Sequence, residues 1–89
     1  MIVEFDRHFE KSIKKLKNQP LAQHIEESII NAEQAINLHN IHSIKKLVGF
    51  KDYYRIRIGD YRVGIKLINS NTIRFILVAH RKDIYKLFP

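Results

Sequence analysis

Apolar and polar residues alternate in two runs in the middle of the chain, at 53–58 and 61–67, where the sequence is YYRIRIGDYRVGIKL. A period of two is typical of a half-buried strand. Gly59 and Asp60 between the runs suit a two-residue hairpin loop with glycine first, because that position needs a backbone angle that glycine reaches easily. We therefore predict a hairpin in which Ile58 lies opposite Tyr61.

This register divides the hairpin into an apolar face and a basic face. Arg57 falls opposite Arg62, and the residue opposite Arg55 is a glycine, so three guanidinium groups surround a position without a side chain. Like charges directly across a ladder are mildly destabilising. Two interpretations of the basic face stay open: a site for a polyanion, and a solvated surface whose arginines pair with carboxylates such as Asp52 and Asp60.

The N-terminal half predicts a short strand at 2–5 and two helices. Asp6 stands at an N-cap position, and apolar residues then recur at helical spacing until Asn18-Gln19-Pro20 ends the first helix. The second helix begins near Leu21. Its expected apolar stripe is Ala22, Ile25, Ile29, Ala32 and Ile36. We expect the two helices to form an antiparallel hairpin that covers the apolar face of the sheet.

Residues 37–52 show no clear period. Apolar residues at 38, 41, 44 and 47 are spaced to anchor a loop or a frayed helical turn. His39 and His42 are three residues apart, but no carboxylate or cysteine accompanies them at ligand spacing, so we expect neither a metal site nor a cofactor.

The last strand is predicted at 73–79, which is apolar at nearly every position and therefore central in the sheet. Pairing Ile68 with Ile73 places Arg62 opposite Ala79 and Arg81 on the same face. Four arginines from three strands would then surround a concave anion site floored by the small residues at 64 and 79, with the aromatic residues of the C-terminal segment nearby.

Composition and charge narrow the class of protein. The 89 residues are 45% hydrophobic and 28% charged, which is typical of one globular α+β domain spanning 1–89. The absence of cysteine excludes disulfides and thiolate catalysis, and no apolar run is long enough to span a membrane, so we expect a cytoplasmic protein. Residues 1–44 hold five basic and six acidic residues, whereas residues 45–89 hold eleven and three. This basic half favours nucleic acid, with an acidic protein or a membrane surface as alternatives.

The order strand, helix, helix and three strands, with YRIRIGDYRV at 54–63 and VAHRKDIY at 78–85, resembles the RelE/ParE superfamily of bacterial toxins. The RelE-like members are the most similar. The resemblance implies a β-α-α-β-β-β fold, with a helical hairpin on one face of a mainly antiparallel sheet. It also implies a type II toxin that cleaves messenger RNA in the ribosomal A site and is neutralised by a cognate antitoxin, without a membrane partner.

The resemblance also implies roles for individual residues. Arg57 and Arg62 would stabilise the phosphorane, Arg81 the leaving group, and Tyr85 would stack on a base or donate a proton. Arg55 would hold the flanking backbone. Independently of the resemblance, we expect Lys51, Lys66 and Lys82 to bind RNA as well.

The general base is the open point of this assignment. The best-known member has lysines at the positions of Arg55 and Arg57, whereas an arginine stays protonated and is a poor base. His80 titrates near neutral pH and is a candidate, although alternation turns it towards the helices if Arg81 faces the site. Asp52 and Asp83 are expected to orient arginines. The alternative functions are a ParE-like gyrase inhibitor and a non-catalytic module that binds RNA or an antitoxin.

Overall fold

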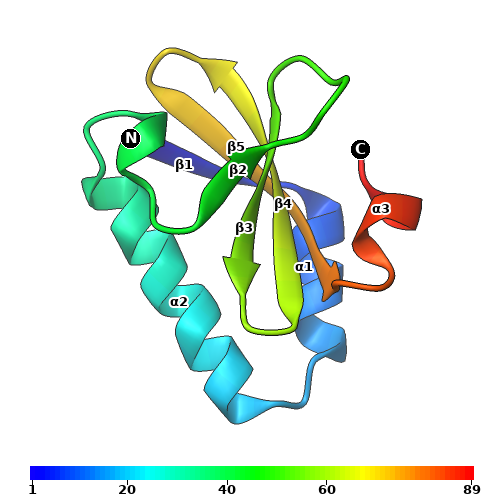
Figure 1. Ribbon diagram of the computed structural model, residues 1–89. Helices are drawn as coiled ribbons and strands as arrows, with labels where there is room; N and C mark the ends of the chain where they lie inside the picture. Colours follow the sequence, from blue (N-terminus) through cyan, green and yellow to red (C-terminus); the bar gives the residue numbers. More distant parts are fainter.

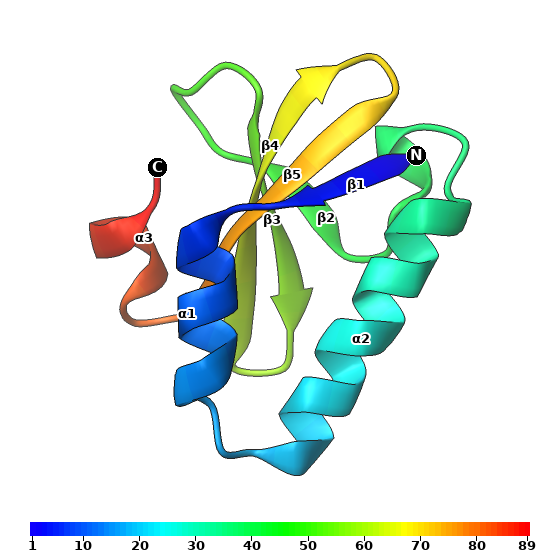
Figure 2. The same cartoon turned by 180° about the vertical axis from the view of Figure 1, so that it is seen from behind.

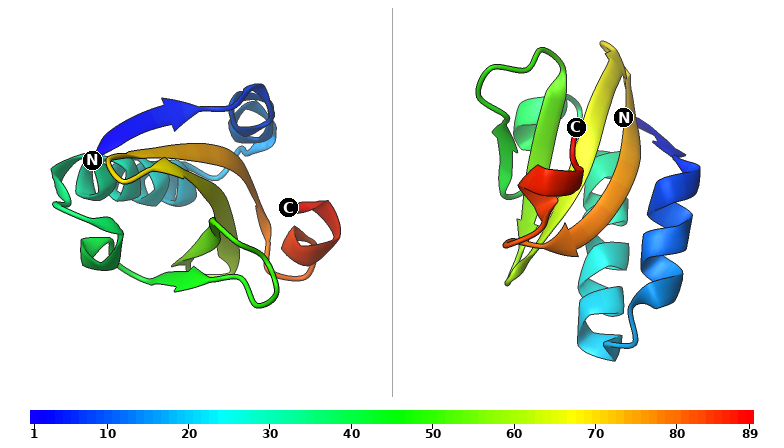
Figure 3. Two further views of the ribbon diagram at one scale, coloured as in Figure 1. Left: turned by 90° about the horizontal axis from the view of Figure 1, so that it is seen from above. Right: turned by 90° about the vertical axis from the view of Figure 1, so that its right-hand side faces the viewer.

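A five-stranded sheet forms the centre of the computed structural model, which describes residues 1–89 (Figure 1). Two helices cover one face of the sheet, and a short C-terminal helix lies against the other (Figure 3). The elements in chain order are β1 (Ile2–Phe5), α1 (Arg7–Lys15), α2 (Gln19–Gln34), the 3₁₀ helix η1 (Leu38–Asn40), β2 (Ile44–Lys46), β3 (Tyr53–Ile58), β4 (Tyr61–Asn69), β5 (Thr72–His80) and α3 (Ile84–Leu87).

The sheet has the strand order β1-β5-β4-β3-β2, in which β1 runs parallel to β5 and all other neighbours are antiparallel. The α+β class and the central position of the last strand are confirmed. Two elements were not predicted: the edge strand β2 and the helix α3. None of the helices is both long and apolar enough to cross a membrane.

Both long helices begin at a side-chain cap: Asp6 was predicted as the cap of α1, whereas the cap of α2 is Asn18, and α2 begins at Gln19 rather than near Leu21. The Asp6 side chain accepts a hydrogen bond from the His8 N–H at 2.8 Å, and the Asn18 side chain accepts one from the Leu21 N–H at 3.1 Å. Pro20 lies in the first turn of α2, where its missing N–H costs nothing. Figure 2 shows both helices in front of the sheet, as the predicted helical hairpin requires.

The predicted apolar stripe of α2 was partly wrong. Ala22 is exposed, and Ile36 is 87% exposed because the helix ends at Gln34, before it. The buried face of α2 is instead formed by Leu21, Ile25 and Ala32. This face packs with the inner side chains of β3, β4 and β5 in a main core whose fully buried members include Ile56, Val63, Ile65, Ile73 and Phe75.

The register between β4 and β5 contains two irregularities that cancel. Ile76 has no partner between the pairs Gly64–Leu77 and Ile65–Phe75, and Ile68 has none between Leu67–Ile73 and Asn69–Thr72. The predicted pairing of Ile68 with Ile73 is therefore wrong, since Leu67 takes that place. Beyond both bulges the predicted pairs Val63–Val78 and Arg62–Ala79 are nevertheless confirmed.

Candidate functional site

The basic face of the sheet is built from cross-strand pairs, which point to the same side. The pairs Arg55–Gly64 and Arg57–Arg62 have the predicted register. The edge strand adds Lys45, which lies opposite Arg55. Lys45 was missed because β2 is only three residues long, too short for a readable period; its flanking Ile44 and Leu47 were the only signal.

The Arg62 side chain is anchored at the β3–β4 turn. Its Nη1 donates to the carbonyl oxygens of Gly59 at 2.8 Å and Tyr61 at 2.9 Å. Burial lowers the pKa of the Arg62 guanidinium, and the positive charges of Arg55 and Arg57 lower it further. Arginine remains protonated at neutral pH despite such a shift. Arg62 is therefore a fixed cation in a cluster of cations.

Backbone carbonyls also bind the side chain of Arg55 and the main chain of Arg81. The Arg55 Nη1 donates to the Ser43 carbonyl at 3.0 Å, and the backbone N–H of Arg81 donates to the Asp60 carbonyl at 2.8 Å. The ion pairs of the structure are Asp6–His8 and Glu4–Arg74, so no arginine of the basic face pairs with a carboxylate. The expectation that Asp52, Asp60 or Asp83 pairs with these arginines is wrong, since no such ion pair is formed and the Arg55 and Arg62 side chains donate to backbone carbonyls instead.

The centre of the basic face is filled, so the predicted hollow over Gly64 and Ala79 is wrong. A Cβ atom at Gly64 would lie 2.7 Å from Cγ of Phe88, which shows that this ring covers the glycine. Phe88 joins Leu47 and Ile84 in a second core that packs on Tyr53, Ile76, Leu77 and Ala79. The small residues of the sheet therefore seat α3 and the segment after it.

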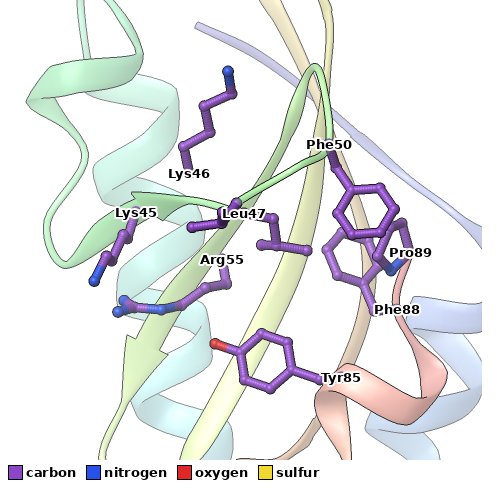
Figure 4. A pocket seen from close by; sticks show the side chains of 9 residues that line it. Lys45, Lys46, Leu47, Phe50, Arg55, Tyr85, Phe88 and Pro89 are labelled. Atoms are coloured by element: carbon purple, nitrogen blue, oxygen red, sulfur yellow. The ribbon is translucent and has the colours of Figure 1, made fainter.

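The hollow lies instead between β2 and α3, where a pocket of about 420 Å³ opens next to Arg55 (Figure 4). Tyr85, on α3, lines this pocket, and its hydroxyl points towards the Arg55 guanidinium (Figure 4). Tyr85 is 63% exposed. The packing of α3 thus brings the predicted aromatic residue next to the predicted arginines.

The remaining predicted site residues are dispersed. His80 packs edge to face on Tyr61 with ring centroids 5.4 Å apart, and its Nδ1 accepts a hydrogen bond from the Lys82 N–H at 3.1 Å. It lines a groove shared with Ser12 and Lys15 of α1, away from the basic face. Lys51 and Lys82 are exposed in turns, and the Lys66 ammonium lies 5.5 Å from the Tyr53 ring centroid. The structure therefore separates His80 from the arginines, whereas Lys66, opposite Tyr53, lies on the same face of the sheet as Arg55 and Arg62.

A comparison with protein families matches residues 3–85 to the ParE toxin of the type II toxin-antitoxin system parDE. Over its full length the chain is 39% identical to Toxin RelE3 from Methanocaldococcus jannaschii, and the match covers 100% of both proteins. The matching family therefore bears the ParE name, whereas the full-length relative bears the RelE name.

Solved structures have the same fold. The RelB-RelE antitoxin-toxin complex from Methanococcus jannaschii matches with a TM-score of 0.77 and 38% identity, over 97% of this chain and 99% of that chain. The isolated Escherichia coli RelE toxin matches with a TM-score of 0.70 and 16% identity over 98% of each chain, which shows the fold alone. Since both the family match and the relative span nearly the whole chain, the protein belongs to the RelE/ParE family of type II toxins.

Proposed function

We propose that the protein is a ribosome-dependent endoribonuclease that cleaves messenger RNA in the A site. The observation that carries this proposal is the set of arginines on the basic face, none of which is neutralised by a carboxylate. Uncompensated guanidinium groups are suited to a phosphate, because they bind its oxygens in pairs. The RelE name of the full-length relative supports the same choice.

The proposed reaction uses the 2′-hydroxyl of the substrate as nucleophile. Its oxygen attacks the adjacent phosphorus, the bond to the 5′-oxygen breaks, and a 2′,3′-cyclic phosphate and a 5′-hydroxyl are formed. Arg57 and Arg62 stabilise the additional negative charge on the phosphorane, and Arg81 stabilises the leaving oxygen. Arg55 holds the flanking phosphate. Tyr85, beside Arg55, stacks on a base or protonates the leaving group.

For the removal of the 2′-hydroxyl proton, the chain offers the fewest candidate residues. His80 is turned away from the basic face and its Nδ1 already accepts a hydrogen bond. Most of the rate acceleration from the chain's own residues then comes from charge stabilisation, and the 2′-hydroxyl proton passes to water or to a group of the ribosome. A site without its own base would work only where the substrate is positioned for it, which agrees with dependence on the ribosome.

A cognate antitoxin is the expected protein partner. The structural relatives include RelB-RelE complexes. We propose that this chain forms a comparable hetero-oligomer, in which an acidic segment of the antitoxin neutralises the basic face. We propose the cytoplasm as its location, because translated messenger RNA is found there.

The test is to induce the chain in growing cells and to map the 5′ ends of messenger RNA. New ends within translated codons are expected for the wild type. Arg62→Ala and Arg81→Ala are expected to abolish both the ends and growth inhibition, whereas Arg7→Ala, which removes one exposed charge from α1, retains them. Full toxicity of both site variants would overturn the assignment. Intact messenger RNA together with a DNA-damage response would favour a gyrase inhibitor. The absence of both messenger RNA cleavage and a DNA-damage response would favour a non-catalytic binding module.

A further inference from the structure

Exposed apolar side chains line part of the pocket between β2 and α3. Phe50, in the loop between β2 and β3, is 49% exposed, and its neighbour Val48 is 91% exposed. Together with Tyr85 they form a group of exposed apolar and aromatic side chains beside Arg55. Clustered apolar surface of this kind marks a binding site more often than isolated exposed residues do.

The loop that carries Phe50 is fixed at both ends. The N–H of the buried Leu47 donates to the Tyr53 carbonyl at 2.9 Å, and the Asp52 carbonyl accepts from the Leu67 N–H at 2.8 Å. Gly49 has a φ of 83°, which only glycine adopts easily and which sharpens the turn just before Phe50. The Phe50 ring is therefore presented at the pocket by a structured loop.

The pocket joins this apolar wall to a basic one. Figure 4 shows Lys45 and Arg55 at one end, Phe50 and Phe88 at the other, and Tyr85 between them. Lys46 points away from this group (Figure 4). Neither Lys45 nor Arg55 has a carboxylate partner. A volume of about 420 Å³ is within the usual range of sites for small organic groups.

An aromatic wall next to unpaired cations fits a ligand that is flat and apolar at one end and anionic at the other. A nucleotide of a single strand has this form: its base stacks on a ring and its phosphate binds lysine and arginine. We propose that this pocket is a nucleotide subsite next to the cleavage site, in which Phe50 packs on a base and Lys45 and Arg55 bind the phosphate attached to it. The proposal rests on RNA being the substrate, and it adds Phe50 and Lys45 to the residues that determine which nucleotide is accepted.

The test is a titration of the full-length protein with a fluorescent RNA tetranucleotide whose 2′-O-methyl groups prevent cleavage. The same oligonucleotide is made with one base missing, at each position in turn. Phe50→Ala is expected to weaken binding about fivefold or more, as the loss of one stacking contact does. Phe50→Tyr retains the ring and the affinity, while Phe50→Leu, which keeps apolar bulk without a ring, is weakened.

The missing base identifies the contact. At one position, removal of the base is expected to weaken binding to the wild type by the same factor as the Phe50→Ala substitution does. The same abasic oligonucleotide is expected to bind Phe50→Ala as tightly as the intact one, because base and ring form a single contact. Lys45→Ala is expected to reduce the slope of log affinity against log salt by about one. The matched control Lys14→Ala, which removes an exposed charge from α1, leaves that slope unchanged.

The subsite is overturned if Phe50→Ala binds the oligonucleotide as tightly as the wild type. It is also overturned if each abasic position weakens binding to the wild type and to Phe50→Ala by the same factor. It is also overturned if Phe50→Ala weakens binding of the antitoxin alone, since the pocket would then serve a protein. Failure of the proposed function can be distinguished from failure of the subsite. If the protein does not cleave messenger RNA, the wild type produces no new 5′ ends, whereas the titration still tests the subsite because it requires no cleavage.

Discussion

The ring of Phe88 lies so close over Gly64 that a Cβ atom there would be 2.7 Å from Cγ and 2.8 Å from both Cδ atoms. Real Cβ atoms do not approach other carbons so closely, so the buried ring has to move when this methyl group is added. Because Phe88 is part of the second core, its movement also displaces α3 and with it Tyr85. Gly64 thus connects the packing of the sheet to the position of a site residue.

Gly64→Ala is expected to lower the free energy of unfolding by about 1–3 kcal/mol, the usual cost of overpacking. Urea denaturation measures this change. Combining it with Phe88→Ala, which removes the Cγ and both Cδ atoms that lie over the glycine, is expected to cost less than the sum of the two single changes. Simple additivity would mean that the two residues do not clash, and a stable Gly64→Ala protein would contradict the placement of Phe88.

His80→Asn is expected to retain growth inhibition. The asparagine side chain still offers an acceptor to the Lys82 N–H, while the imidazole is removed. The ring faces Tyr61 and α1 rather than the arginines, so its removal costs packing with Tyr61 and not a proton acceptor. Cell growth after induction and the melting temperature are measured together. Loss of toxicity in a variant that melts like the wild type would identify His80 as the base.

Arg62→Lys separates the effect of charge from that of hydrogen-bond geometry on the basic face. Lysine keeps the positive charge but cannot donate two parallel hydrogen bonds to a phosphate and also reach the Gly59 and Tyr61 carbonyls. The cleavage rate on programmed ribosomes is expected to fall about 100-fold, as for the loss of one stabilising donor in a transition state. Arg7→Lys is the matched control on α1. A rate within a few-fold of the wild type would show that charge alone suffices at position 62.

The sequence predicted the hairpin and its register because long alternation and a glycine at the turn act locally. Ile56, Val63 and their neighbours have the same partners in the structure as in the pattern. It did not predict β2 or α3, because these elements have three and four residues, which is too few to show a period. Elements this short depend on tertiary contacts for their stability. Ile84, Leu87 and Phe88 did have helical spacing, which was a readable signal.

This difference had consequences for the site. The arginines on β3 and β4 were placed correctly because they belong to the elements with strong local patterns. Lys45 was missed with β2, and the hollow was placed over Gly64 because the segment that fills it had not been assigned a position. Cavities are determined by what packs on a sheet, and this follows less directly from the sequence than the strands themselves.

The N-cap of α1 predicts a pH dependence of stability. The hydrogen bonds from the His8 backbone and side chain lower the pKa of the Asp6 carboxyl. The folded protein therefore binds this proton less readily than the unfolded chain, whose aspartates titrate near pH 3.9. The stabilisation is present above that pH and is lost as the pH falls through the lower pKa of the folded state.

Asp6→Asn preserves a side-chain acceptor for the His8 N–H but removes the charge. Urea denaturation between pH 6 and pH 2 is expected to give a stability curve that falls less steeply with acid than that of the wild type. Glu10→Gln, also in the first turn of α1 but without a hydrogen bond to His8, is the matched control and is expected to follow the wild-type curve. Parallel curves for Asp6→Asn and the wild type would show that the Asp6 carboxylate does not couple folding to protonation.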